Sequence, residues 1–268
     1  MGLVFNNETA GIYEAWCQSS QGRAMDRSTE ELIMALVEPK PGERVLDIGC
    51  GTGNHLLAFS RLGLDISGID ASSYMIERAR ERLGHRCDLK KGMAEDLPFD
   101  DNEFDLAVLI NTLEFLDDPL QALREAGRVA NRKVFIGVMN SLSCNGVLKR
   151  LQGYLGDSLF SRAKFFNLWK LKALLQMAYG PVPVSWGCIM LSSFLAEEMM
   201  PFGNHLWNWK HYPFGSFLGI SATMIYRIKT DNLWIRLKEA RPSLFGAKTL
   251  EDLKHSRGVD GDKRGVSL

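Results

Sequence analysis

The sequence lacks an excess of charge of either sign. Its 268 residues include 32 lysines and arginines and 32 aspartates and glutamates, so the formal net charge is zero. A protein that binds nucleic acid through its overall charge would show a basic excess, and we therefore expect no nucleic-acid partner. Disorder of the whole chain is also excluded, because 46% hydrophobic residues are enough to form a core.

Cysteines and long hydrophobic runs are scarce as well. The five cysteines form no CxxC pair, which indicates reduced thiols rather than a disulfide framework. The longest charge-free stretches, 180–196 and 212–226, are shorter than the ~18 apolar residues of a membrane-spanning helix. The first residues show no basic region followed by an apolar one, so no signal peptide is expected. We predict a cytoplasmic protein without a transmembrane segment, and peripheral membrane contact stays open.

What the sequence does contain is a regular alternation of apolar runs and helical patterns between residues 40 and 140. Single helices between the strands imply parallel βαβ units, hence a doubly wound α/β fold with a mostly parallel sheet. The predicted strands are 44–48, 64–69, 86–91, 104–110 and 133–138, and the predicted helices are 54–62, 72–83 and 119–129. Ahead of this region, residues 28–31 match a capping box, which predicts a helix from there to Val37.

Glycines cluster where the first of these strands meets the first helix. Gly49, Gly51 and Gly53 let the backbone turn tightly and let a ligand lie against the main chain. The dinucleotide fingerprint G-x-G-x-x-G fails at Asn54, and no G-x-x-x-x-G-K-[ST] loop is present. The loop therefore predicts a ligand site, but for neither a dinucleotide nor a nucleoside triphosphate.

Two carboxylates accompany this loop. Asp70 ends the second predicted strand, where a carboxylate can accept hydrogen bonds from both hydroxyls of a ribose. Asp47, near the end of the first strand, favours an ammonium or sulfonium group over a pyrophosphate. Two simpler interpretations stay open: Asp47 caps the adjacent loop, and Asp70 caps the helix that begins at Ser72.

Four segments in this order resemble class I methyltransferases that depend on S-adenosylmethionine (SAM). They are residues 45–54, 68–72, 94–99 and 104–106. The subgroup that they resemble is the small-molecule type of ubiquinone and menaquinone biosynthesis. The resemblance implies a Rossmann-like methyltransferase fold, α/β, with a doubly wound, mostly parallel, seven-stranded sheet and a helical cap insertion. It also implies SAM as the cofactor and no metal.

With this resemblance the chain divides into four predicted regions. Residues 1–38 would form an N-terminal helical lid, and residues 39–139 the SAM-binding α/β core. Residues 140–228 would form a cap insertion and the C-terminal strands that complete the sheet, with a helix at 166–179 and a strand at 217–228. Residues 229–268 would form a charged, loosely ordered tail.

The resemblance also assigns contacts for the methionine and ribose parts of SAM. Gly49, Gly51 and Thr52 would line the methionine part, with Asp47 near its amino group. Asp70 would hold the ribose hydroxyls. The full set of predicted cofactor-binding residues is Asp47, Gly49, Gly51, Thr52, Gly53, Asp70, Ala71, Met93, Ala94, Glu95 and Asn111.

The adenine contact departs from the family pattern. Met93 stands where similar proteins usually have Asp or Asn, whose side chain bonds the adenine amino group. The backbone N–H of Ala94 would still bond the adenine ring, and Glu95 is the candidate replacement for the lost contact. Asn111, after the fourth strand, would face the sulfonium. That Met93 is an ordinary core residue stays open.

The catalytic residue stays unknown. Methyl transfer from a sulfonium is an in-line displacement, which positioning alone accelerates without metal or covalent intermediate. A hydroxyl acceptor also benefits from a general base. Four candidates for that base are present: His205, His211, Tyr13 and Glu114.

Aromatic side chains concentrate in residues 186–214, next to the predicted insertion. They favour a small acceptor that is hydrophobic or aromatic, lipid-like molecules included, although packing of the cap onto the sheet explains them equally. The sequence therefore predicts a SAM-dependent methyltransferase with such an acceptor. The alternative is a catalytically inactive SAM-binding sensor or partner subunit of the same fold. Oligomeric state is not predicted.

Overall fold

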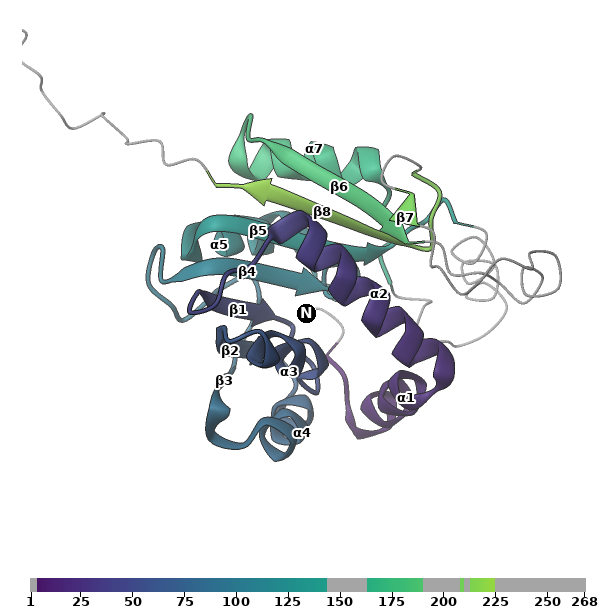
Figure 1. Ribbon diagram of the computed structural model, residues 1–268, viewed down its shortest axis with the longest axis vertical. Coiled ribbons are helices and arrows are strands. Elements are labelled where there is room, and N and C mark those ends of the chain that lie inside the picture. Colours follow the sequence, from purple (N-terminus) through teal and green to yellow (C-terminus); the bar gives the residue numbers. More distant parts are fainter. Residues whose placement is uncertain (1–3, 144–162, 190–207, 210–212, 225–268) are drawn as a thin grey trace, which may run out of the picture. The chain divides into compact units, whose positions relative to one another are not determined.

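A mixed β-sheet organises the part of the chain that the computed structural model describes, namely residues 4–143, 163–189, 208–209 and 213–224 (Figure 1). The chain separates into residues 1–226 and 227–268, and every described residue belongs to the first of these units. The sheet has the strand order β3-β2-β1-β4-β5-β8-β6-β7. Its strands are β1 (Arg44–Ile48), β2 (Asp65–Asp70), β3 (Cys87–Lys91), β4 (Phe104–Ile110), β5 (Ala130–Met139), β6 (Val184–Ile189), β7 (Asn208–Trp209) and β8 (Phe217–Thr223).

Strand direction confirms the doubly wound prediction. β1 pairs in parallel with β2 and β4, β2 with β3, and β4 with β5. β8 then inserts antiparallel between β5 and β6. The predicted seven strands are present, and the two-residue β7 adds an eighth at the β6 edge. The carboxyl ends of the parallel strands meet at one edge of the sheet, where open α/β sheets bind ligands.

Helices cover both faces of the sheet, as doubly wound folds require. They are α1 (Asn7–Gln18), α2 (Ser20–Val37), α3 (Asn54–Arg61), α4 (Ser73–Leu83), α5 (Pro119–Val129) and α7 (Leu168–Tyr179), with short 3-10 turns η1 (Gly84–Arg86) and η2 (Leu113–Phe115). One core cluster joins α2, α3 and α4 to the sheet through residues such as Leu32, Phe59 and Ile76. The other joins α5 and α7 through residues such as Leu123 and Leu171.

Polar caps set where two of these helices begin. The Ser72 hydroxyl accepts a hydrogen bond from Met75 N at the start of α4. Asp118 Oδ1 accepts hydrogen bonds from Leu120 N and Gln121 N at the start of α5. Such caps satisfy backbone donors that the first turn of a helix leaves unpaired. Both starts lie where the sequence predicts them.

The second helix differs from its prediction. α2 begins at Ser20, with Ser19 as its cap, instead of at the capping box 28–31. Ser28 lies inside the helix, and its hydroxyl donates to the carbonyl oxygen of Ala24, four residues earlier. The expectation that a helix begins at this box was therefore wrong, because a buried serine can bond the preceding turn instead of a helix start.

No helix among the described residues is long and apolar enough to cross a membrane. Residues 227–268, which include the whole of the predicted charged tail, lie outside the described part of the chain. The same holds for 144–162 and for most of 190–212, which belong to the predicted cap.

Candidate active site

The glycine loop closes the carboxyl end of β1 against its neighbours. Gly49 N and Cys50 N both donate to the carbonyl oxygen of Ile69, at 2.7 and 3.1 Å. Gly49 has a positive φ of 75°, and a Cβ there would lie 2.4 Å from the side chain of Thr112. Only glycine fits such a position, since both the backbone conformation and the close approach exclude a side chain. The loop is thus held between β2 and the segment that follows β4.

Gly51, at the centre of the loop, faces free space. Its φ is 52°, and no atom lies within 4 Å of the place a Cβ would take. Its N–H donates a hydrogen bond of 2.9 Å to Oδ2 of Asp70. A ligand can therefore approach this stretch of main chain without a side chain in its way.

Gly53 and Thr52 have different surroundings. A Cβ on Gly53, which has a φ of 78° and caps α3, would lie 2.8 Å from a methyl group of Leu83. The buried Thr52 hydroxyl accepts a hydrogen bond from Arg82 at 3.1 Å. These two residues shape the loop from its protein side, whereas Gly51 lies on its open side.

Asp70 joins the loop to the start of α4. Besides the bond from Gly51, its Oδ1 accepts a hydrogen bond of 2.8 Å from Ser72 N. Burial raises the pKa of Asp70, and the two N–H bonds oppose that rise. Each carboxylate oxygen has a second lone pair, so the group can still accept ribose hydroxyls. The cap of α4 itself is Ser72, although Asp70 does bond the Ser72 N–H.

Asp47 is a buried carboxyl group at the end of β1, only 2% exposed. Burial, with a further contribution from the charge of Asp70, raises the pKa of Asp47 to about 8. Among the described residues, no hydrogen bond to its carboxylate is recorded, so the interpretation of Asp47 as a loop cap has no contact to support it. A cation beside this group would lower its pKa again, since opposite charge favours the ionised form.

Two further oxygens at this edge of the sheet are buried without a partner. One is Oδ1 of Asn111, which follows β4 with a φ of 52° and whose N–H donates to the carbonyl oxygen of Gly137. The other is Oε2 of Glu95, whose Oε1 accepts only a long bond of 3.4 Å from Asp118 N. A buried acceptor without a donor costs free energy, which makes both atoms candidates for ligand contacts.

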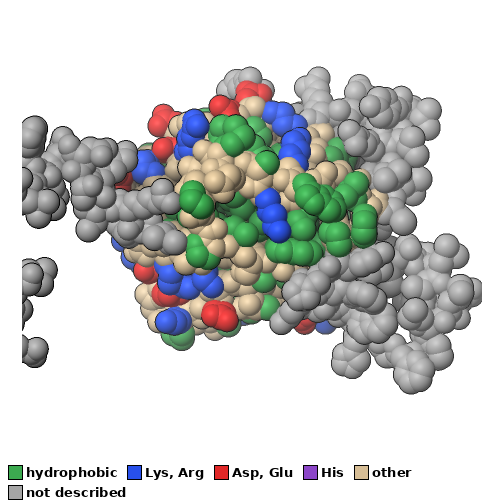
Figure 2. Space-filling view, turned by 90° about the horizontal axis from the view of Figure 1, so that it is seen from above, with side chains coloured by type: hydrophobic (Ala, Val, Ile, Leu, Met, Phe, Trp, Pro, Cys, Tyr) green, Lys and Arg blue, Asp and Glu red, His purple; other side chains and the backbone are tan. Residues whose placement is uncertain are grey.

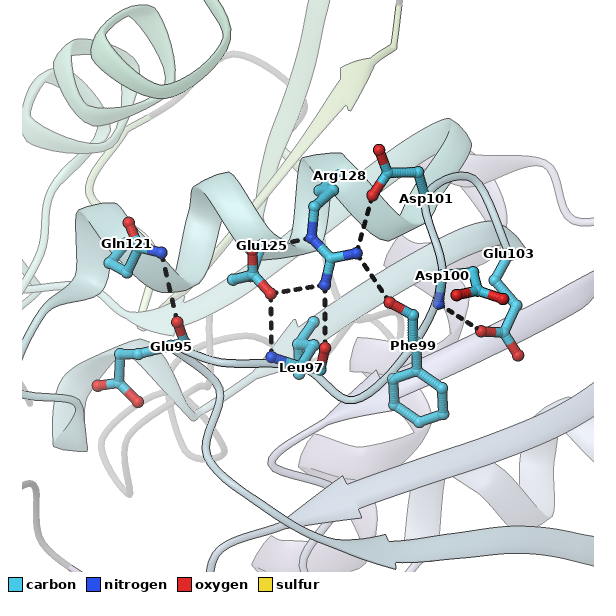
Figure 3. A network of polar contacts seen from close by, with 9 residues as sticks. All are labelled: Glu95, Leu97, Phe99, Asp100, Asp101, Glu103, Gln121, Glu125 and Arg128. Atoms are coloured by element: carbon cyan, nitrogen blue, oxygen red, sulfur yellow. Dashed lines mark hydrogen bonds and ion pairs between the residues drawn. The ribbon is translucent and has the colours of Figure 1, made fainter.

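The segment that carries Met93 and Glu95 is fastened to α5. Glu125 accepts a hydrogen bond from Leu97 N at 2.9 Å, and Arg128 donates to the carbonyl oxygens of Leu97 and Phe99 (Figure 3). Arg128 and Glu125 are themselves paired at 2.7 Å. The loop after β3 is therefore anchored behind the candidate site.

The remaining residues of the predicted adenine contact lie in this anchored loop or at the end of β2. Met93 is partly buried and forms an isolated bridge with Asp96. Ala94 belongs to the buried core, and Ala71 is partly buried. Met93 is therefore not part of the fully buried core, although it is only partly exposed.

The structure describes two of the four candidate bases, Tyr13 and Glu114. His205 and His211 lie outside the described residues. Tyr13 is in α1, with its ring 6.1 Å from that of Phe5 and 6.2 Å from that of Trp16, centroid to centroid. Burial raises the pKa of Tyr13 well above its usual value, and the nearby Asp47 charge adds to this. Tyr13 is thus near the glycine loop but a poor proton acceptor at neutral pH.

Glu114 lies in η2 and is fully buried. Its Oε1 accepts a hydrogen bond of 2.7 Å from Met139 N, while Oε2 has no partner. Burial raises the pKa of Glu114 to about 7, although the Met139 bond opposes the shift. The contact with β5 gives Glu114 a structural task, and its role as a base stays a prediction.

Arg82 is a residue that the sequence does not single out. From α4 its guanidinium donates to Thr52 Oγ1 at 3.1 Å and to Asn54 Oδ1, and it reaches Glu14 of α1 at 3.4 Å. It connects the glycine loop to the N-terminal helix. No motif marks it, because an arginine in an amphipathic helix is ordinarily a solvated surface residue.

The sheet is open and mostly parallel, and its carboxyl edge carries a glycine loop and two carboxylates. This combination is typical of the class I methyltransferase fold. Residues 46–136 match the family model of the methyltransferase domain. Residues 46–136 of this chain are therefore similar to methyltransferase domains, and the doubly wound α/β fold expected from the sequence is confirmed.

Relatives match this domain rather than their whole length. The chain is 34% identical over 123 residues to a 24-methylenesterol C-methyltransferase of Arabidopsis thaliana, covering 40% of this chain and 34% of that protein. It is 33% identical over 102 residues to a demethylmenaquinone methyltransferase of Staphylococcus carnosus, covering 36% and 42%. The chain thus spans less than half the length of these two relatives.

The fold is similar over a longer stretch. A crystal structure of a SAM-dependent methyltransferase from Thermotoga maritima superposes with a TM-score of 0.65 at 24% identity. The superposition covers 81% of this chain and 97% of that one. The similarity therefore extends well beyond residues 46–136, to most of the described chain.

Proposed function

We propose that this protein transfers a methyl group from SAM to a small acceptor that is hydrophobic or aromatic. The observation that carries the proposal is the open main chain at Gly51, in the loop that follows the strand of Asp47 and is bonded by Asp70. Asp70 bonds that main chain directly, and Asp47 is buried without a hydrogen-bonding partner among the described residues. This arrangement suits a ligand that has both ribose hydroxyls and a positive charge.

The chain's own residues would bind the donor as follows. Asp47 would pair with the ammonium group, and Asp70 would accept the ribose hydroxyls. Asn111 would direct its unpartnered Oδ1 toward the ligand near the sulfonium. Bound SAM supplies a methyl group on a positively charged sulfur, which makes that methyl electrophilic.

For the adenine, we propose that Glu95 replaces the usual contact. Met93 has no side-chain group that could accept a hydrogen bond from the adenine amine as an Asp or Asn would. Glu95, two residues on, has a buried oxygen without a donor. The amine would supply that donor, while the Ala94 N–H would bond the ring.

The nature of the acceptor is inferred from aromatic side chains and from the relatives. Near the carboxyl ends of the strands, Phe5 packs edge-on against Phe115 of η2 with centroids 5.2 Å apart, and Tyr13 lies next to Phe5. Two relatives are named for a sterol and for a demethylmenaquinone as acceptors. An apolar acceptor would gain binding energy from such rings, and positioning it in line would supply much of the rate acceleration.

The regional divisions made from the sequence belong to the same proposal. We infer that α1 and the start of α2, within residues 1–38, act as a lid. Residues 140–228 would contribute the acceptor pocket. The cytoplasmic location stays a prediction.

Calorimetric titration with SAM and with S-adenosylhomocysteine tests the donor site. The parent protein should bind both ligands. The Asp70→Ala variant should lose this binding, whereas Asp65→Ala, at the exposed start of the same strand, should retain it. Absence of binding to the parent protein would overturn the proposal.

Methyl transfer requires a second experiment. The protein is incubated with methyl-labelled SAM and separate aqueous and organic-solvent extracts of cells. Label in a compound of the organic extract is expected. Label only in water-soluble compounds would overturn the acceptor class, and SAM binding without any labelled product would favour the inactive sensor.

A further inference from the structure

The face formed by α7 and β6 has an unusual composition. Residues 163–189, which contain both elements, include three lysines and no aspartate or glutamate. The chain as a whole carries equal numbers of acidic and basic residues, so this segment departs from the average. Its surface is basic although the protein is neutral.

Large apolar side chains on this face are exposed. Trp169 is 58% exposed and Met177 is 62% exposed, and both point away from the core side of α7 that Leu171 and Leu175 occupy. Val184, at the start of β6, is 38% exposed. Exposed tryptophan and methionine on one helix are costly in water, which points to a surface that contacts something apolar.

Two of the lysines lie against aromatic rings beside these residues. The ammonium of Lys170 is 4.7 Å from the ring centre of Phe166, and that of Lys172 is 5.6 Å from the ring centre of Trp186. Positive charge and apolar side chains therefore lie side by side on this face. Lys164 is engaged differently, because it donates to the carbonyl oxygens of Leu116 and Asp117.

Figure 2 looks onto the side of the molecule where α7 and β6 lie, and Lys or Arg side chains are interspersed there with hydrophobic ones. In this view the acidic side chains of the described residues lie toward the margins. This combination favours interfacial membrane binding, in which tryptophan lies at the headgroup level and lysines lie near anionic lipid.

We propose that the α7–β6 face docks the protein peripherally onto an anionic lipid surface. Trp169 and Met177 would enter the headgroup region, and Lys170 and Lys172 would pair with lipid phosphates. The occupant we propose is a membrane because the face combines apolar side chains with positive charge, whereas a nucleic acid would need charge mainly. The proposal does not depend on methyl transfer, although an acceptor dissolved in lipid would become accessible in this way.

Sedimentation of the full-length protein with lipid vesicles tests the proposal. Vesicles of phosphatidylcholine with phosphatidylglycerol are compared with vesicles of phosphatidylcholine alone. We expect binding to the first kind and little to the second. The double substitution Lys170→Gln and Lys172→Gln should lower the partition coefficient by roughly 30-fold at low salt, and the loss should shrink at high salt.

Two further variants separate charge from apolar contact. Trp169→Ser should weaken binding to anionic vesicles at low and at high salt alike. The matched control carries Arg86→Gln and Lys91→Gln, two exposed residues at the opposite, β3 edge of the sheet, and should bind like the parent protein. The thermal unfolding of all variants is first compared with that of the parent protein by circular dichroism, so that loss of folding is distinguished from loss of docking.

Several results would overturn the proposal. They are no sedimentation of the parent protein with anionic vesicles, equal binding to both kinds of vesicle, or equal losses in the α7 and β3 double variants. Binding to an oligonucleotide but not to vesicles would assign the face to nucleic acid instead.

Discussion

The backbone N–H of Gly51 donates a hydrogen bond of 2.9 Å to Oδ2 of Asp70. This bond connects the glycine loop after β1 to the end of β2, and the second oxygen of Asp70 accepts the Ser72 N–H. One side chain therefore orders both segments that would surround the ribose and methionine parts of SAM. Because the carboxylate of Asp70 can accept further hydrogen bonds, substitution of Asp70 is the most direct test of the site.

Asp70→Ala should abolish SAM binding at concentrations that saturate the parent protein. Two ribose hydroxyls bonded to a carboxylate contribute about 1.5–3 kcal/mol each, so the affinity should fall by roughly 100-fold or more. Isothermal titration calorimetry measures the change. Asp65→Ala, on the same strand with a 71% exposed side chain, is the control. Equal affinities of the two variants would contradict the assignment.

Asp47→Asn should stabilise the protein at alkaline pH. The pKa of Asp47 rises from 3.8 to about 8 on folding, because the group is buried beside Asp70. Between these values the folded protein retains a proton that the unfolded chain releases, so the stability of the parent protein falls as the pH rises. At pH 8 the variant should exceed the parent by about 2–5 kcal/mol, and near pH 4 the difference should vanish.

Urea unfolding of both proteins over this pH range measures the Asp47 effect. Saturating SAM should reduce the difference at pH 8, since its ammonium group would compensate the carboxylate. A difference that is independent of pH would show that the variant acts through packing and not through the charge.

The α/β core was predictable because its signals are local. β1 and β4 are mostly apolar, and α4 and α5 begin at side-chain caps, Ser72 and Asp118. The start of α2 was not predictable in this way. Ser28 can cap a helix or bond the turn before it, and the choice depends on α2 packing against the sheet through Leu32.

The candidate site was predictable where a backbone requirement or a strand end marks the residue. Gly49, Gly51 and Asp70 are such cases, and the structure brings them together. Arg82 was not predictable, since its contacts with the loop and with α1 join residues 28 and 68 positions apart in the chain. For the methyl acceptor, the sequence could indicate only a region rich in aromatic residues. Aromatic content alone does not say which side chains line a pocket.

Glu114 should respond differently to two substitutions. Glu114→Ala removes the acceptor for Met139 N and leaves a cavity, which should cost about 2–4 kcal/mol of stability. Glu114→Gln retains an acceptor oxygen and removes the ionisation. Because burial raises the pKa of Glu114 to about 7, this group contributes to the stability that the parent protein loses as the pH rises from about 5 to 7. Glu114→Gln should lack that contribution and keep the loss that Asp47 causes.

The same pair of variants tests the proposed role of Glu114 as a base. If Glu114 takes up a proton from the methyl acceptor during the reaction, Glu114→Gln should lower kcat without changing the affinity for SAM. An unchanged kcat would leave the residue with its structural contact alone. Equal destabilisation by both substitutions would contradict the importance of the Met139 bond.

Arg82→Gln should loosen the connection between α1 and the glycine loop. The variant loses the bonds to Thr52 and Glu14, and because the side chain of Arg82 is partly exposed the stability cost should be only about 1 kcal/mol. Amide hydrogen exchange should become faster in α1, and SAM affinity should fall about tenfold. Arg80→Gln in the same helix, whose recorded bond is to the Leu89 carbonyl, is the control. Equal exchange in both variants would contradict the connection.

Alanine substitutions at Gly51 and Gly53 should separate ligand binding from folding. Both glycines have positive φ, which costs an alanine about 1–2 kcal/mol. At Gly53 the new methyl group would also approach Leu83 to 2.8 Å, so Gly53→Ala should reduce the melting temperature further. At Gly51 the methyl group enters free space on the open side of the loop. Gly51→Ala should therefore fold with the smaller loss but bind SAM poorly, and a Gly51→Ala variant that binds like the parent would show that the donor does not lie against this main chain.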